Sequence, residues 1–385
     1  MKKTLVALAA LAASGAFAQS TVSIWGAVDA SYNYASGDTA TGNQNKSSLA
    51  NSQYGSSKLG FSGLEDLGGG LKAKFWLEAG LANDTGAGKG SNSNNQNSGA
   101  AIAAAGGQGI VFQRRSYVGL VGNFGEIKLG REYVNTFLGV QGAVDPFFTN
   151  GPADSTQMAL LLSVYKGFAT TGTNASNMVT YITPDMGGFS ANGQIWMGEN
   201  VSGPNNANDG GGYSITAQYA KGPIFVSLGQ QQTKYSGLTN AGVASGQGDY
   251  TLQSLSASYD FGPAKIMYTY AHEGVAALAG PDLKNDTNMF AVSVPFGAFK
   301  FKGSYIIGTN NLSSGGLNAG TKADMKGSMF GLGVDYTLSK RSIVYATYAG
   351  FSNSDNGNNY GANVIGGMTA NGSAGNLAIG MYHSF

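Results

Sequence analysis

The feature that most constrains this chain is an alternation of apolar and polar residues, in segments of about ten residues, that recurs from residue 21 onward. The clearest segment places Phe330, Leu332, Val334, Tyr336 and Leu338 in alternation with Met329, Gly331, Gly333, Asp335 and Thr337. A period of two residues puts alternate side chains on opposite faces of a β-strand. The pattern therefore predicts an all-β chain in which each strand has one apolar and one polar face.

The connections between these segments alternate between short and long. The short ones are tight turns at about residues 66–70, 123–125, 184–188, 222–223, 262–263, 295–297 and 339–340. The long ones are polar loops near residues 35–55, 82–110, 134–173, 200–211, 236–249, 274–285, 309–325 and 352–374. This alternation is typical of an antiparallel up-and-down barrel, with turns at one rim and loops at the other. Seven turns and eight loops predict a transmembrane barrel of about sixteen strands.

The polar faces indicate which side of the barrel meets water. An apolar face cannot line an aqueous interior while the opposite face carries charge, so the apolar faces are predicted to meet lipid. The predicted lumen-lining charges are Lys74, Glu78, Lys300, Lys302 and Asp335. A soluble sandwich is the alternative, but it would bury one face of each sheet and would not need charges pointing inward. Only 11% of the residues are charged, against about 25% in soluble domains, which favours the membrane barrel.

The N-terminus has the organisation of a secretory signal peptide. Lys2 and Lys3 precede an apolar run, and Ala16-Phe17-Ala18 is a small-x-small cleavage site. We therefore expect residues 1–18 to be removed and residues 19–385 to form one barrel domain. Loss of two lysines changes the net charge from +1 to −1, since 20 basic and 21 acidic side chains remain. A nearly neutral chain gives no reason to expect nucleic acid as a partner.

Several motifs resemble those of the trimeric porins of Gram-negative outer membranes, above all those of beta-proteobacteria. These motifs are Lys58-Leu59-Gly60-Phe61, Leu64-Glu65-Asp66-Leu67-Gly68-Gly69-Gly70-Leu71-Lys72-Ala73, Arg115-Ser116-Tyr117-Val118-Gly119-Leu120, Phe124-Gly125-Glu126-Ile127-Lys128-Leu129-Gly130-Arg131 and a C-terminal Phe385. The resemblance covers the whole mature chain in order. It implies a homotrimer in contact with outer-membrane lipid and lipopolysaccharide. It also implies that Phe385 is the signal read by the outer-membrane assembly machinery.

The resemblance further implies a constriction of the pore. In such porins the third long loop folds into the barrel, and the matching segment here is residues 134–173. Basic side chains form a ladder on the wall facing that loop, with acidic side chains nearby to offset their repulsion. The matching positions are Lys58, Arg114 and Arg131 for the ladder, with Asp145, Glu132 and Asp154 as acidic partners.

Two details of this ladder depend on local backbone geometry. Arg131 falls on the apolar face of its segment, so a bulge near Gly130 is needed to turn it into the lumen. Only one of Arg114 and Arg115 can face the lumen on a regular strand. Matching the segment to Lys58-Leu59-Gly60 favours Arg114 and leaves Arg115 at the rim or at a subunit contact. The family usually carries arginine where this chain has Lys58, which indicates a weaker preference for anions.

Few residues suit catalysis. The chain has two histidines, of which His272 is expected to form an exposed strand-end pair with Glu273, and His383 is expected to be a packing residue. The absence of cysteine and the scarcity of histidine argue against a transition-metal site. We therefore expect neither an enzyme nor a cofactor.

A barrel of sixteen strands encloses more space than side chains fill. The predicted function is a water-filled channel for passive diffusion of small hydrophilic solutes and ions, weakly anion-preferring at most, in the outer membrane. A substrate-specific channel and a plugged structural or adhesive barrel remain as alternatives. A sugar channel would show a run of aromatic side chains in the lumen, and the sequence offers only Trp76 as an inward candidate.

Overall fold

The computed structural model describes residues 21–91, 95–96, 109–199, 208–235, 247–277, 280–312 and 324–385. The predicted signal peptide, residues 1–18, lies outside the described residues. No helix in the described part of the chain is long and apolar enough to cross a membrane.

The strands are β1 (Thr21–Thr39), β2 (Gly42–Asn51), β3 (Lys58–Gly68), β4 (Leu71–Ala82), β5 (Ala87–Gly88), β6 (Arg115–Gly122), β7 (Gly125–Tyr133), β8 (Asn174–Ile182), β9 (Phe189–Trp196), β10 (Gly212–Lys221), β11 (Ile224–Thr233), β12 (Gln247–Asp260), β13 (Lys265–Ala277), β14 (Leu283–Phe296), β15 (Phe299–Asn310), β16 (Met325–Thr337), β17 (Ser342–Ser354) and β18 (Ser373–Ser384). The short helices are η1 (Thr136–Gln141), α2 (Gly142–Val144), α3 (Thr156–Ala159), η2 (Leu161–Tyr165) and α4 (Ala362–Ile365).

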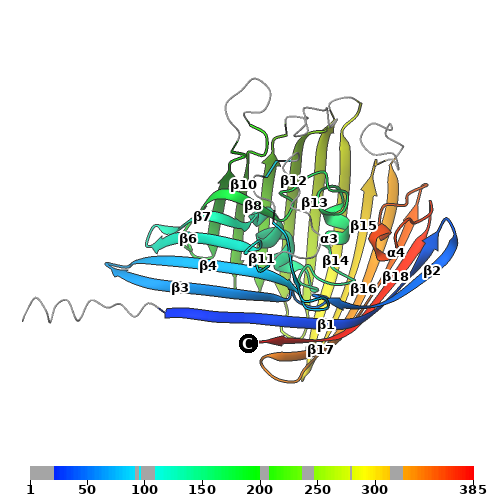
Figure 1. Cartoon of the computed structure of the whole chain (residues 1–385), viewed down its shortest axis with the longest axis horizontal. Coiled ribbons are helices and arrows are strands. Elements are labelled where there is room, and N and C mark those ends of the chain that lie inside the picture. Colours follow the sequence, from blue (N-terminus) through cyan, green and yellow to red (C-terminus); the bar gives the residue numbers. More distant parts are fainter. Residues whose placement is uncertain are drawn as a thin grey trace, which may run out of the picture.

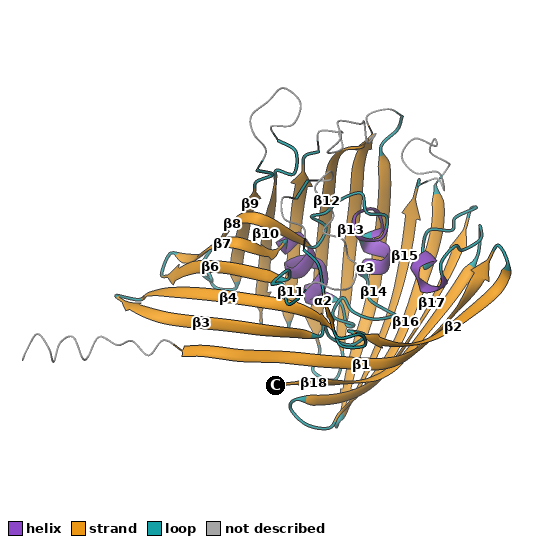
Figure 2. Ribbon diagram, in the orientation of Figure 1, coloured by secondary structure: helices purple, strands orange, loops and turns teal. Residues whose placement is uncertain are grey.

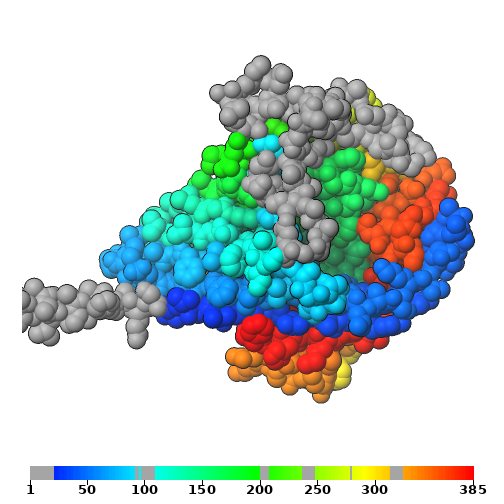
Figure 3. All heavy atoms as spheres, viewed as in Figure 1, coloured from blue at the N-terminus to red at the C-terminus, as the bar shows by residue number. Residues whose placement is uncertain are grey.

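The strands close into one antiparallel barrel (Figure 1). β1 pairs with β18, so the first strand lies against the last, as the blue and red segments of Figure 3 show. β2 and β3 pair with successive halves of β1 and together form one barrel strand, while the two-residue β5 pairs with the end of β4. The eighteen strands of the described residues therefore make a sixteen-stranded barrel, which confirms the predicted fold class.

The alternation of the sequence maps onto the two faces of the wall. In β16, Phe330 and Leu332 are exposed on the outer face, whereas Met329 and Asp335 are buried on the inner face. All seven predicted tight turns join neighbouring antiparallel strands. The period-two pattern therefore predicted both the strands and their orientation.

One predicted loop is wrong. Residues 35–55 were expected to be a polar loop, but β1 and β2 run through most of this segment and reverse at Thr39–Gly42. The interruption lies instead at residues 52–57, between β2 and β3. The inward carboxylate of Asp29 accepts the backbone N–H groups of Tyr54 at 2.6 Å and Gly55 at 2.9 Å, and Tyr345 donates its hydroxyl to the same carboxylate. These bonds satisfy backbone groups that the strand break frees.

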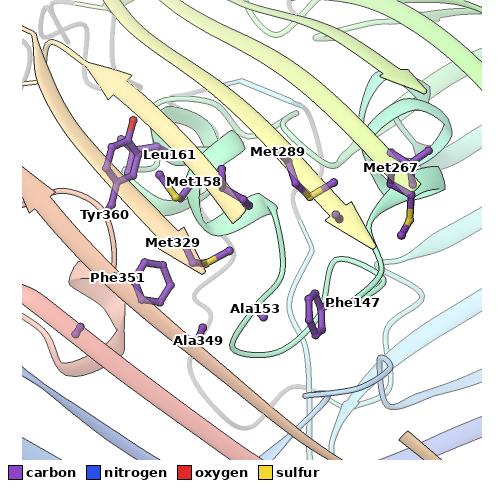
Figure 4. Close-up of a cluster of buried hydrophobic side chains, with 14 of the residues drawn as sticks. Phe147, Ala153, Met158, Leu161, Met267, Met289, Met329, Ala349, Phe351 and Tyr360 are labelled. Atoms are coloured by element: carbon purple, nitrogen blue, oxygen red, sulfur yellow. The ribbon is translucent and has the colours of Figure 1, made fainter. Parts of the chain in front are cut away.

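The connection between β7 and β8, residues 134–173, folds into the barrel as predicted. Figure 2 shows its helices inside the ring of strands. The loop packs on the inner wall through apolar side chains, among which Phe147, Met158 and Leu161 meet Met289 and Met329 of the wall (Figure 4). A second apolar cluster joins Leu160 and Leu162 of the loop to inward residues of β12, β13 and β14. Burial of these side chains fixes the loop against one side of the barrel.

A buried carboxylate anchors the loop from β13. Glu273 accepts N–H groups from Leu162 at 2.8 Å and Ser163 at 3.1 Å, and hydroxyls from Ser163 and Tyr250. Its side chain is fully buried. The expectation of an exposed strand-end pair with His272 is therefore wrong for Glu273, because the loop covers this part of the strand. His272 contacts Asp286, and its Nδ1 lies 2.8 Å from a carboxylate oxygen.

The C-terminal residue completes the closure of the barrel. Phe385 exchanges two backbone hydrogen bonds with Gly26 of β1, at 3.1 and 3.0 Å. Its ring lies so close to Gly26 that a Cβ there would come within 2.5 Å of it.

His383 is exposed on β18, and its ring contacts the hydroxyl of Ser342. The expectation that His383 is a packing residue is therefore wrong.

Candidate functional site: the charged wall of the lumen

The inner faces of β3, β4, β6 and β7 carry a cluster of charged side chains around Glu78. Arg114 Nε lies 2.6 Å and Lys58 Nζ 3.7 Å from the same carboxylate oxygen of Glu78. The indole of Trp76 donates to the other oxygen at 3.0 Å. Three donors thus share one carboxylate that is almost completely buried. The structure brings Lys58 and Arg114 of the predicted ladder together at Glu78, which the sequence predicted only as a lumen-lining residue.

A second carboxylate continues the cluster. Arg115 lies 2.8 Å and Lys128 3.1 Å from Glu132. Lys74 forms a separate ion pair with Glu126 at 2.9 Å. We call the set formed by Lys58, Lys74, Glu78, Lys89, Arg114, Arg115, Glu126, Lys128 and Glu132 the charged wall.

The placement of Arg115 corrects an expectation. Arg115 is the register partner of Glu78 in the β4–β6 pair, and directly opposed residues share a face, so Arg115 points into the lumen rather than to the rim or a subunit contact. Arg114 also reaches Glu78 because it precedes β6 and is not bound by the alternation of the strand. The expectation that only one of the two arginines can face the lumen is therefore wrong, because the strict alternation of a strand does not apply beyond its end.

Lys89 is a member of the charged wall that the sequence did not reveal. It follows β5, and its side chain approaches Arg114 next to Gly80, where an added Cβ would meet both. Burial lowers the pKa of Lys89, and the charge of Arg114 lowers it further. No motif marks this residue, since its position depends on how the segment after β4 folds back.

Arg131 lies apart from this cluster. The pairing of β7 with β8 has a bulge between Gly130 and Glu132, as predicted. Arg131 nevertheless pairs with Ser116, the residue after Arg115. It therefore lies on the opposite face of the sheet from Arg115. It donates to the Gln113 carbonyl and, at 2.7 Å, to the Ser176 hydroxyl. The bulge therefore does not bring Arg131 to Glu78.

The two loop aspartates are buried inside residues 134–173. Asp145 accepts N–H groups from Phe147 and Ser155, both at 2.7 Å, and Asp154 accepts the N–H and hydroxyl of Thr156. Burial, together with the charge of the nearby Asp145, raises the pKa of Asp154 to about 7. Both carboxylates hold the loop in shape, and the hydrogen bonds above join them to loop residues rather than to the charged wall.

The predicted lumen-lining residues of β15 and β16 form a separate group. Lys302 and Asp335 are both buried and pair at 2.7 Å. Lys300 lies across the strand pair from Asp335, and its Nζ is 5.5 Å from the ring of Phe148 in the loop. These residues face inward as predicted.

The charge balance of the charged wall favours anions. It contains six basic and three acidic side chains, so it keeps an excess of three positive charges after pairing. Positive charge along a low-dielectric channel raises the local concentration of anions. Among the described residues, no group of three or more His, Cys, Asp and Glu side chains is arranged to hold a metal.

Comparison with known proteins agrees with this architecture. The model of the Gram-negative porin family matches residues 4–356. The chain is 33% identical to outer membrane porin protein 32 of Delftia acidovorans, with full coverage of both proteins. It is 30% identical to an outer membrane porin of Bordetella pertussis, over 90% of this chain and 93% of that protein.

Solved structures agree as well. The anion-selective porin from Comamonas acidovorans superimposes with a TM-score of 0.77 and 30% identity, covering 95% of this chain and 100% of that one. The trimer form of OmpT from Vibrio cholerae, 16% identical with a TM-score of 0.61 over 95% of this chain and 99% of that one, shares the fold alone. The closed sixteen-stranded barrel, the inward loop and these matches lead to one conclusion: the chain belongs to the Gram-negative porin family and is a non-enzymatic channel of the outer membrane.

Proposed function

We propose that this general porin prefers anions over cations and that the charged wall is the site of selection. The observation that carries the proposal is the excess of positive charge on the charged wall, six basic against three acidic side chains. The main contacts of the loop's short helices go to β10–β15. The lysine and arginine side chains of the charged wall remain partly exposed and can therefore meet solutes. The anion selectivity of the Comamonas acidovorans porin, at 30% identity, supports the same preference.

The test is the reversal potential of single channels in planar bilayers under a potassium chloride gradient. Replacement of Arg114 and Arg115 by glutamine should lower the anion-to-cation permeability ratio about two- to fivefold, because two of the six positive charges are lost. Arg131→Gln is the matched control and should change the ratio little, since Arg131 lies apart from the charged wall. An unchanged ratio in the double variant, or an equal effect of Arg131→Gln, contradicts the proposal.

We further propose that the protein assembles as a homotrimer. Trimers are usual in the porin family, and the trimer form of OmpT has the same fold. The outer surface offers the exposed apolar side chains that subunits and outer-membrane lipid, including lipopolysaccharide, would cover. Conductance steps that occur in groups of three, together with the mass of the detergent-solubilised protein, test this assembly. Single steps from a particle of monomer mass contradict it.

Export and insertion complete the proposal. Residues 1–18 serve as a cleaved signal peptide, and Phe385 as the signal for the outer-membrane assembly machinery. N-terminal sequencing of the mature protein should begin at Gln19. Deletion of Phe385 should lower the amount of assembled barrel in the outer membrane, and unchanged assembly contradicts this role.

A further inference from the structure

A group of aromatic side chains lies in the lumen between the tip of the loop and the wall of β17 and β18. The ring of Tyr54 is 5.9 Å from Phe148, 5.3 Å from Tyr345 and 5.5 Å from Tyr382, measured between centroids. With Lys300, whose Nζ is 5.5 Å from the ring of Phe148, we call this group the aromatic patch. Its five residues come from five separate parts of the chain, so the sequence does not reveal it.

Phe148 holds an unusual conformation at the tip of the loop. Both Phe148 and Thr149 have φ of 55°, in the left-handed region that residues with a side chain seldom adopt. Such strain costs free energy and persists where the surrounding structure requires it. The strained backbone leaves the ring of Phe148 46% exposed. The neighbouring Phe147, by contrast, is buried in the apolar cluster of the same loop. The strain therefore presents an aromatic ring to the lumen.

The positive charge next to that ring is not offset by an ion pair. The carboxylate of Asp335 bonds to Lys302, which is buried, at 2.7 Å. Among the described residues, no carboxylate lies within 4.0 Å of the Lys300 ammonium group. Lys300 is partly exposed and thus accessible to a solute that also touches Phe148.

We propose that the aromatic patch is a binding subsite for monocyclic aromatic carboxylates of the benzoate type. The ring of the solute packs against Phe148 and Tyr54, and its carboxylate meets the Lys300 ammonium group. Aromatic pairs favour tilted or edge-to-face contacts, which the exposed ring of Phe148 permits. A sugar slide fits less well, because the patch is one cluster rather than a run of rings along the pore. The inference goes beyond the proposed anion preference but rests on it to the extent that a carboxylate must enter the lumen.

The test is concentration-dependent block of single-channel current by benzoate, with cyclohexanecarboxylate as a probe of equal charge and similar size. Benzoate should block at a lower concentration than cyclohexanecarboxylate. Phe148→Leu should raise the half-blocking concentration of benzoate about three- to tenfold, whereas Phe148→Tyr, which keeps the ring, should stay within about twofold. Lys300→Gln should raise it about threefold or more.

Two control variants match these changes. Phe124→Leu removes an exposed ring from the turn between β6 and β7. Lys72→Gln removes a positive charge at the start of β4, next to the turn that follows β3. Neither variant should alter benzoate block. Equal block by the two probes overturns the proposal, as does benzoate block that survives Phe148→Leu. Reversal potentials of the same channels report the anion preference separately. If the channel prefers anions but benzoate does not block it preferentially, the subsite is refuted and the proposed selectivity stands. If benzoate blocks preferentially but the channel does not prefer anions, the proposed selectivity is refuted and the subsite stands.

Discussion

The two sides of the lumen are built on the same alternation of residues but serve different purposes. On the charged wall, inward positions carry lysines and arginines that remain partly exposed, paired with glutamates of which Glu78 and Glu132 are buried. On the side covered by the loop, which we call the covered wall (β10–β16), most inward positions are uncharged and buried, and among its charged side chains Glu273, Lys302 and Asp335 are buried as well. The comparison shows that the inward face that meets water carries many charged side chains, whereas the inward face that meets the loop is mostly uncharged.

Glycines of β16 show how closely the covered wall is fitted to the loop. A Cβ added at Gly331 would come within 2.6 Å of Ala153, and one at Gly333 within 2.7 Å of Phe147. Methionines complete the contact, since their flexible side chains fill irregular gaps. The covered wall is therefore mainly a packing surface, and most of the partly exposed basic side chains of the described lumen lie on the charged wall.

The largest expected effect comes from removal of the loop. Deletion of residues 140–165 should raise single-channel conductance about twofold or more, because the loop occupies part of the lumen. It should also expose the apolar covered wall and lower thermal stability. Conductance is measured in planar bilayers and stability by the midpoint of heat unfolding. If conductance stays constant, the loop does not narrow the pore.

Replacement of the single side chain of Glu273 should loosen the contact between the loop and the barrel wall. Glu273→Ala leaves the N–H groups of Leu162 and Ser163 without their acceptor, which should cost about 2–4 kcal/mol. We expect a lower unfolding midpoint and noisier open-channel current. Glu65→Ala, at an exposed position near the turn of β3, is the control. A stable, quiet Glu273→Ala channel would show that the apolar clusters alone hold the loop.

The loop should also respond to pH. Because the pKa of Asp154 rises from 3.8 to about 7 on folding, the folded loop favours the protonated form. The stability it contributes is complete below about pH 4 and is lost as pH rises through about 7. Open-channel noise should therefore increase between about pH 5 and 8, and Asp154→Asn should flatten this change. Asp145 and Tyr165 also face this carboxyl, so a profile that Asp154→Asn leaves unchanged assigns the titration elsewhere.

The smallest effect concerns the charged wall. Glu78→Gln removes the carboxylate that offsets Arg114 and Lys58, so the anion-to-cation permeability ratio should rise about 1.5- to twofold. This direction is opposite to that of the arginine replacements. Glu65→Gln is the control, and the reversal potential is the measurement. A fall in the ratio would mean that the two basic side chains move out of the lumen when Glu78 is neutral.

The alternation of residues in the sequence determined the class of fold and the number of strands, and the resemblance of its motifs to porins indicated which loop enters the barrel. The fold class and strand number could be predicted because alternation is local, and because lipid outside and water inside require opposite faces on every strand. The sequence also placed Lys58, Glu78 and Arg114 in the lumen, where the structure brings them together.

Only the tertiary structure decided which charges meet and which are buried. Glu78 and Arg114 are 36 residues apart, and Glu273 and Leu162 are 111 apart, so neither contact can be inferred from neighbours in the sequence. Asp145 and Asp154 were expected to face the pore, but the fold of the loop directs them to its own backbone. Alternation tells which face a residue occupies; whether that face meets water depends on what the rest of the chain places on it.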